Sequence, residues 1–130
     1  MSRIATQVQQ MMLAYGQHVA SEPALPDSIA VRSLRMRLLD EEHQEYIDAE
    51  NHDDLTEVAD ALADQVVIIY GTALAYGIPL DDVLDEVMRS NLSKIVDGEV
   101  IRRDDGKVLK PEGWTPPDIA GVLEAAGGAK

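Results

Sequence analysis

Hydrophobic residues recur at helical spacing along most of this chain, and prolines and glycines separate the stretches in which they do so. The first stretch predicts an amphipathic helix over residues 3–20, because its apolar positions share one helical face; they are Ile4, Val8, Met11, Met12, Tyr15 and Val19. A second, longer helix is predicted from an N-cap at Asp27 or Ser28 to about residue 51, since Pro23 and Pro26 cannot lie in its interior.

Capping residues, glycine and proline also predict the limits of two further helices. The third is predicted to begin after a cap at Asp53 or Asp54 and to continue to about residue 76, where Gly77 suits the left-handed conformation of a helix end. The fourth begins with Pro79 as its first helical residue, because proline cannot continue the preceding helix but fits a first turn. It carries acidic residues in that turn and is predicted to end near Lys94.

The pattern changes after the fourth helix. Residues 95–117 contain repeated Asp-Gly and Pro signals for turns, and two short apolar segments, 100–101 and 108–109, that suit a small hairpin. Four of the eleven lysines and arginines lie here, so we call residues 95–117 the basic arm. A short helix is predicted over residues 118–126. The sequence therefore predicts one all-α domain over residues 1–130, with four main helices, the basic arm and a short last helix.

Acidic residues continue the apolar stripes of the second and third predicted helices. They are Glu41, Glu42 and Glu45 on the second helix, and Glu57, Asp60 and Asp64 on the third. Ionised carboxylates that face a core require a positive partner, and few cations lie within local reach. A cluster of oxygen ligands without cysteine or suitably spaced histidine favours Mg²⁺ or Mn²⁺. The alternative is an ordinary solvated acidic face, and that reading is weakest for Asp64, which apolar neighbours flank.

The composition of the chain limits the binding partners and the cellular location that can be expected. The net charge of −13 argues against a nucleic-acid duplex, because no basic face is available for a phosphate backbone. The absence of cysteine excludes disulfides and thiolate metal sites and favours a cytoplasmic setting. Residues 1–8 do not resemble a signal peptide. The most apolar run, residues 66–78, is shorter than the roughly 20 residues that span a bilayer, so no membrane partner is expected.

Polar residues near the end of the fourth helix form a second candidate group. Asn91 lies on the apolar stripe of that helix and Lys94 follows one turn later, so both are candidates to face the carboxylate pocket and bind a substrate's sugar or phosphate. Alternatively, Asn91 only satisfies backbone groups near the helix end. In the arm, Lys107 and Lys110 suit triphosphate contacts, although a solvated loop is the competing interpretation. Trp114 is either a packing anchor or a surface on which a base stacks.

Together these motifs resemble a known superfamily. The order E-E-x-x-E at 41–45, E-x-x-D at 57–60 and R-S-N-L-S-K at 89–94 is similar to the all-α NTP pyrophosphatases, which include MazG, dimeric dUTPases and phosphoribosyl-ATP pyrophosphohydrolase. Residues 62–74 and 105–114 look closest to the MazG-like dUTP pyrophosphatases, and the resemblance covers roughly residues 34–118. It implies cleavage of nucleoside triphosphates, with dUTP preferred, to monophosphate and pyrophosphate by water attack at the α-phosphorus, using Mg²⁺ or Mn²⁺.

The resemblance also suggests roles for the residues. Glu42, Glu45 and Asp64 would be core ligands of a two- or three-ion cluster that Glu41, Glu57 and Asp60 complete, with Glu41 or Glu45 as the general base. Asn91 would contact the sugar or base, and the phosphates would be contacted by Lys94, Lys107 and Lys110. One position departs from the pattern: Ala61 stands where relatives commonly have a glutamate, and Asp60 or Glu57 is expected to replace that ligand.

Oligomerisation and two rival functions follow from the same features. The third helix is apolar nearly all round, which one layer of four helices cannot cover, so a homodimer is expected and a tetramer fits the resemblance. One rival is a nucleotide-binding or regulatory module without turnover, which Ala61 keeps open. The other is a structural helical bundle with solvated acidic faces. For an active enzyme, dCTP, a non-canonical nucleotide or phosphoribosyl-ATP are the alternative substrates, in a house-cleaning or metabolic role.

Overall fold

The computed structural model describes residues 1–128, and this part of the chain is all-helical. The helices in chain order are α1 (Arg3–Ala14), α2 (Ile29–Asn51), α3 (Leu55–Ala75), α4 (Leu80–Leu92) and α5 (Ile119–Ala125). Within the described residues, β pairing is limited to two isolated bridges. The all-α prediction, with four main helices and a short last one, is therefore confirmed.

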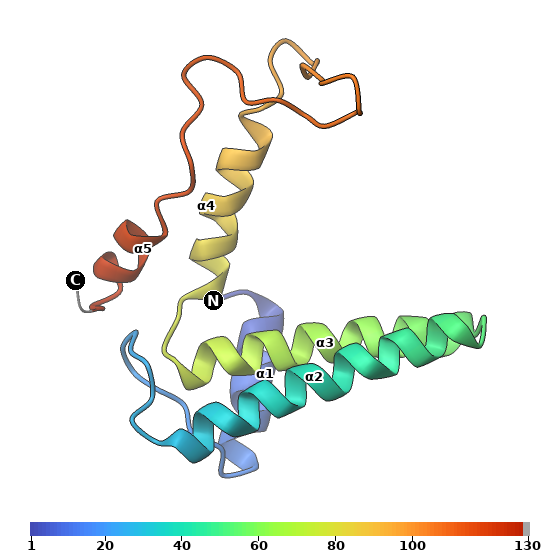
Figure 1. The fold of residues 1–130 in the computed structure, drawn as a ribbon. Coiled ribbons are helices and arrows are strands. Elements are labelled where there is room, and N and C mark those ends of the chain that lie inside the picture. The colour runs from blue at the N-terminus through green and yellow to red at the C-terminus, as the bar shows by residue number, and fades with distance from the viewer. Residues whose placement is uncertain (129–130) are drawn as a thin grey trace.

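Helices α2 and α3 form a long antiparallel hairpin, which is the largest element of the fold (Figure 1). Ser28 caps α2 by accepting a hydrogen bond from Val31 N at 3.2 Å, as the sequence predicted. At the tip, Asp53 adopts a positive φ of 52° and Asp54 caps α3 by accepting from Glu57 N at 3.1 Å. Because the turn is short, residues at equal sequence distance from it lie at similar levels on the two helices. This geometry positions the carboxylates described below.

Helix α1 is shorter than predicted. It ends at Ala14, whereas the apolar spacing predicted a helix to residue 20. Gly16 takes the left-handed conformation at φ 71°, and Gln17 N donates to Met12 O at 2.9 Å, which closes the helix end. The chain then turns back, and Ala20 N donates to Leu74 O at 2.9 Å. Val19 still packs against the core, so its apolar character reflected burial and not helix.

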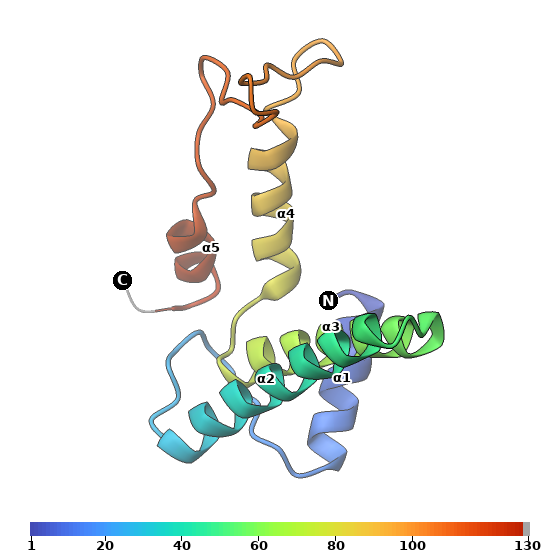
Figure 2. The ribbon, with the colours of Figure 1, turned by 45° about the vertical axis from the view of Figure 1, so that its right-hand side comes forward.

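The compact core lies where α1 crosses α3. Val8 and Met12 of α1 and Ala75 of α3 are buried together, and partly buried residues of α2, such as Val31, pack around them. This arrangement leaves the far halves of α2 and α3 extending beyond α1, as Figure 2 shows. The far half of the hairpin is therefore the more open part of the fold.

Helix α4 leaves the end of α3 and stands away from the hairpin, with α5 beside it (Figures 1 and 2). Pro79 is the N-cap and not the first helical residue, and the helix ends at Leu92, slightly before the predicted end. The start of α4 is tied down by Asp81, which accepts from Ser2 N at 2.6 Å and from the Tyr70 hydroxyl at 2.9 Å. The hydrogen bond from Ser2 N contributes most to lowering the pKa of Asp81.

The basic arm lies at the far end of α4 and makes the short pairing that the sequence predicted (Figure 1). Leu109 N donates to Ile101 O at 2.7 Å, and Arg102 and Val108 form an antiparallel bridge. The paired segment is too short to form a strand. The arm then returns along α4 to α5, whose N-cap Asp118 accepts from Gly121 N at 3.0 Å.

Two helices expose apolar stripes in the single chain. On α4, Leu84, Met88 and Leu92 are 42–55% exposed, and on α3 an exposed stripe is formed by Leu62, Val66 and Ile69. Isolated apolar side chains on a surface are ordinary, but rows along one face of a helix are typical of surfaces that another element covers.

By length and composition alone, α3 is also apolar enough to cross a membrane. Core helices of globular proteins meet the same criteria. Here α3 packs against both α1 and α2, and it carries Asp64 on the face toward α2. Its place in the fold is therefore that of a bundle helix.

Candidate metal centre

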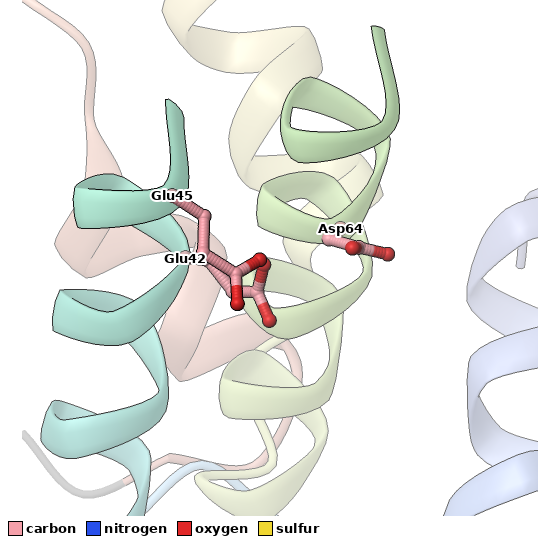
Figure 3. Close-up of side chains that lie close together, drawn as sticks. All are labelled: Glu42, Glu45 and Asp64. Atoms are coloured by element: carbon pink, nitrogen blue, oxygen red, sulfur yellow. The ribbon is translucent and has the colours of Figure 1, made fainter. Parts of the chain in front are cut away.

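Three carboxylates converge between α2 and α3 in the far half of the hairpin. Glu42 and Glu45 project from successive turns of α2, and Figure 3 shows their carboxylates side by side next to α3, which carries Asp64. One carboxylate oxygen of each residue lies within 4.8 Å of the other two. Glu42 and Asp64 stand at equal sequence distance from Asp53 in the turn, so the antiparallel pairing brings them to one level. The structure thus brings together the three residues expected as core ligands.

Burial and like charges raise the pKa values of two carboxyl groups in this cluster. Burial raises the pKa of Glu42 to about 7, together with the charge of Glu45, a side-chain hydrogen bond with Glu45 and the smaller effects of Asp64 and Asp60. Burial, followed by the charges of Asp60 and Glu45, also raises the pKa of Asp64. Among the described residues, the ion pairs are Arg89–Glu86 and Arg103–Asp105, and neither includes a member of the cluster. The carboxylates therefore repel one another with no side-chain cation to offset them.

One carboxylate oxygen of the cluster indicates that a bound cation would offset the negative charge. Glu42 Oε2 is buried and has no hydrogen-bond partner. A buried carboxylate oxygen normally has a donor or a metal ion, because leaving it unpaired costs free energy. The donor set is oxygen only, which suits Mg²⁺ or Mn²⁺ better than zinc. The residues present therefore fit a hard divalent cation held by Glu42, Glu45 and Asp64.

A groove of about 550 Å³ opens beside the cluster toward the tip of the hairpin. Glu45 lines it together with Glu57 and Asp60, two of the other predicted ligands, both of which are exposed. Ala61 lines it as well, 3% exposed and at the same sequence distance from the turn as Glu45. Because alanine is small and has no ligand atom, a further ion in this groove would rely on Glu57 and Asp60, which also line it.

Other residues of this groove were not identified from the sequence. Asp48, His52 and Asp54 also line the groove, although none of them was among the ligands predicted from the sequence. Their alignment arises from the turn at the hairpin tip, which pattern analysis of one helix does not reveal. Glu41, in contrast, is exposed and belongs neither to the cluster nor to the groove lining.

The predicted substrate-binding residues lie elsewhere in the chain. Asn91 and Lys94 are at the end of α4, and Lys107 and Lys110 are in the basic arm, far along α4 from the hairpin (Figures 1 and 2). A single chain therefore does not bring these four residues to its own carboxylates. Its spacing placed Asn91 on the apolar stripe of the fourth helix, but in the structure Asn91 is exposed.

Two buried polar residues were missed by the sequence analysis. Ser90, which precedes Asn91, is fully buried and anchors the arm by donating from Oγ to Thr115 O at 2.8 Å. Arg35, 4% exposed, lies between α2 and α3 and donates from Nη2 to Ile68 O at 3.1 Å. It lies two turns before Glu42 on the same stripe of α2, a position where an apolar residue is the usual expectation.

Comparison with known proteins identifies the family to which most of the helical part of the chain is similar. A family model described as phosphoribosyl-ATP pyrophosphohydrolase matches residues 8–91, a span that runs from α1 to the end of α4 and includes all six predicted carboxylates. The match ends before Lys94 and the basic arm. A search of the curated proteins found no match.

Proposed function

Because the chain belongs to the phosphoribosyl-ATP pyrophosphohydrolase family, part of the MazG-like all-helical superfamily of pyrophosphohydrolases, we propose that it hydrolyses a nucleoside triphosphate to the monophosphate and pyrophosphate. The observation that carries this proposal is the cluster of Glu42, Glu45 and Asp64, with the unpartnered buried oxygen of Glu42. This cluster lies inside the region that the family model matches.

The chain's own residues have distinct parts in this reaction. Glu42, Glu45 and Asp64 hold the cation, and Glu57 and Asp60 extend the acidic surface for a second ion along the groove. Bound Mg²⁺ or Mn²⁺ would neutralise the triphosphate and make a water molecule more acidic. Glu45 lies in both the cluster and the groove lining, so it is well placed to accept a proton from attacking water, with Glu41 as the other candidate base.

For the substrate we propose dUTP first. The support is the likeness of residues 62–74 and of the arm at 105–114 to MazG-like dUTP pyrophosphatases. Phosphoribosyl-ATP is the second candidate, because the family model that matches residues 8–91 carries that description. Both substrates present a triphosphate, so the same carboxylates suit either one.

A homodimer completes this proposal. Lys94, just after α4, and the lysines of the arm lie far from the carboxylates of their own chain, while α3 and α4 expose apolar stripes that a second copy would cover. Pairing two copies in this way would place the lysines at the end of α4 and in the arm of one chain near the carboxylate cluster of the other, which charge complementarity between these side chains favours. A tetramer of two such dimers is compatible with the same surfaces, and we propose a cytoplasmic setting.

Pyrophosphate release from a nucleotide panel tests the function directly. The panel contains dUTP, UTP, dCTP, dATP and phosphoribosyl-ATP, each with Mg²⁺, with Mn²⁺ and with EDTA. We expect metal-dependent release that is highest with dUTP and is lost in Glu42→Gln and Asp64→Asn. Highest release with phosphoribosyl-ATP would transfer the assignment to the second candidate. Nucleotide binding without any release would favour the non-catalytic module.

A further inference from the structure

Two lysines from different parts of the chain converge on the ring of Trp114. Lys94 Nζ lies 5.7 Å and Lys110 Nζ lies 4.6 Å from the ring centroid. Lys94 follows the end of α4, and Lys110 lies in the basic arm. Both distances are within the range of cation–π attraction, in which an ammonium group is drawn to the electron-rich face of the ring. The ring of Trp114 therefore brings together the ammonium groups of two lysines that are distant in the sequence.

The ring itself is held in place by α4. Its Nε1 donates to Ser90 O at 3.0 Å, and Ser90 Oγ donates to the carbonyl oxygen of Thr115, the next residue, at 2.8 Å. Ser90 is fully buried, and Trp114 N also donates to Pro111 O at 3.1 Å. These contacts fix the indole from the helix side and from the arm side. Its orientation is therefore set by buried polar contacts that do not depend on the lysines.

Neither lysine has an acidic partner. In the part of the chain that the structure describes, the ion pairs are Arg89–Glu86 and Arg103–Asp105, and neither includes Lys94 or Lys110. Two ammonium groups on one ring repel each other, and the net charge of −13 gives the chain many carboxylates that are not used here. A pair of unneutralised cations held on a rigid platform suits an anion that carries more than one negative charge.

We infer that Trp114 is a positioning residue, which holds Lys94 and Lys110 together as one binding site for the polyphosphate chain of the nucleotide. This inference rests on the proposed function for the identity of the nucleotide, but the anion site itself is testable without turnover. In this inference the indole ring of Trp114 contacts the two lysines and does not stack on the base of the nucleotide. The lysines would bind terminal phosphates that the carboxylate-held cation does not neutralise.

The protein contains a single tryptophan, so its fluorescence reports on this site alone. Metal-free protein is titrated with inorganic tripolyphosphate, pyrophosphate and orthophosphate, and the emission of Trp114 is followed. We expect a saturable change with tripolyphosphate, a weaker one with pyrophosphate and little with orthophosphate at equal ionic strength. A change that does not saturate, or that is equal for orthophosphate, would indicate general screening and would overturn the inference.

A charge-matched pair of variants separates local contacts from net charge. Lys94→Ala with Lys110→Ala should abolish the saturable change. Arg32→Ala with Arg37→Ala removes the same charge from exposed positions of α2 and should retain the change. Equal loss in both double variants would show that only the overall charge matters, which contradicts a site at Trp114.

Substitution of the ring tests its role as a platform. Trp114→Leu removes the aromatic face and should weaken tripolyphosphate binding, measured by calorimetry, about tenfold, whereas Trp114→Phe keeps a face and should lose about threefold or less. With nucleotide, Trp114→Leu should raise KM more than it lowers kcat. If Trp114→Leu melts early, the lysine double variant, which leaves the ring intact, decides the question.

The outcomes separate this inference from the proposed function. A saturable titration in a protein that hydrolyses no nucleotide would support the anion site and remove the enzyme assignment. Normal hydrolysis with an unchanged KM in both Trp114→Leu and the lysine double variant would support the enzyme and overturn the role of Trp114.

Discussion

The guanidinium of Arg35 occupies the space that a side chain at Gly71 would need. A Cβ built at residue 71 would stand 2.5 Å from Arg35 Nη2. The guanidinium is held there because Nε donates to Thr72 Oγ1 and Nη2 donates to Ile68 O, both at 3.1 Å. Arg35 is buried without a carboxylate partner, and burial lowers its pKa. This contact joins α2 and α3 at the core end of the hairpin that carries the cluster.

Gly71→Ala is therefore expected to destabilise the fold, although alanine is the better helix former. The new methyl group must displace the buried guanidinium and break its bond to Ile68 O, which we expect to cost about 1 to 3 kcal/mol. Urea denaturation measures the change. In an Arg35→Ala background the same substitution should be neutral or stabilising, because the space is then free. Equal cost in both backgrounds would mean that Arg35 does not restrict residue 71.

Metal binding should stabilise the wild-type protein and not the ligand variants. Low millimolar Mg²⁺ or Mn²⁺ is expected to raise the melting temperature, because the ion binds the folded cluster and relieves repulsion among Glu42, Glu45 and Asp64. In EDTA, Glu42→Gln should melt higher than wild type and should show no shift with metal. Asp40→Asn removes the same charge at an exposed position of α2 and should keep the full shift. A metal shift retained by Glu42→Gln would exclude Glu42 as a ligand.

The pKa of Glu42 predicts how the stability of metal-free protein depends on pH. Its folded-state pKa of about 7 lies above its ordinary value of 4.5, so between these values the folded state holds a proton that the unfolded state has lost. The free energy of unfolding should therefore fall as pH rises from 4.5 to 7 and should level off above 7. Denaturation in EDTA at several pH values measures this slope. Glu42→Gln should flatten it, whereas an unchanged slope would place the titrating group elsewhere.

The sequence predicted the hairpin and its carboxylates well because both depend on local spacing. Ser28 and Asp54 cap the helices as expected, and periodicity placed Glu42, Glu45 and Asp64 on facing stripes. The predicted end of α1 was wrong because Gly16 adopts a left-handed conformation, which ends the helix although the helical spacing of apolar residues continues beyond it.

The remaining differences arise from contacts between elements. No spacing along α2 alone shows that Arg35 faces Gly71, or that Asp48 and His52 face Glu57 across the turn. Asn91 was predicted to be buried because apolar residues surround it in the helical period. In the single chain α4 packs mainly against α5, so its remaining face, which includes Asn91, is exposed.

Mixing two variants that each lack a different part of the site tests whether the site is shared between two copies. Glu42→Gln removes a ligand of the carboxylate cluster, and the lysine double variant, Lys94→Ala with Lys110→Ala, removes the polyphosphate contacts. If the two parts come from different chains, a hybrid dimer contains one complete site and one site that lacks both parts. Random exchange makes about half of the dimers hybrid, so the mixture should recover about a quarter of the wild-type rate at low substrate.

The physical reason for this expectation is the placement of the two groups in one chain. α4 carries Lys94 away from the hairpin, and the ring of Trp114 holds Lys110 at that same distant end. The variants are mixed, partly unfolded in urea and refolded together to allow exchange, and pyrophosphate release is measured against each variant treated alone. Light scattering on the same samples reports the oligomeric state. No recovery in a mixture shown to contain hybrid dimers would require each chain to complete its own site, and a monomer that still hydrolyses nucleotide would rule out the dimer altogether.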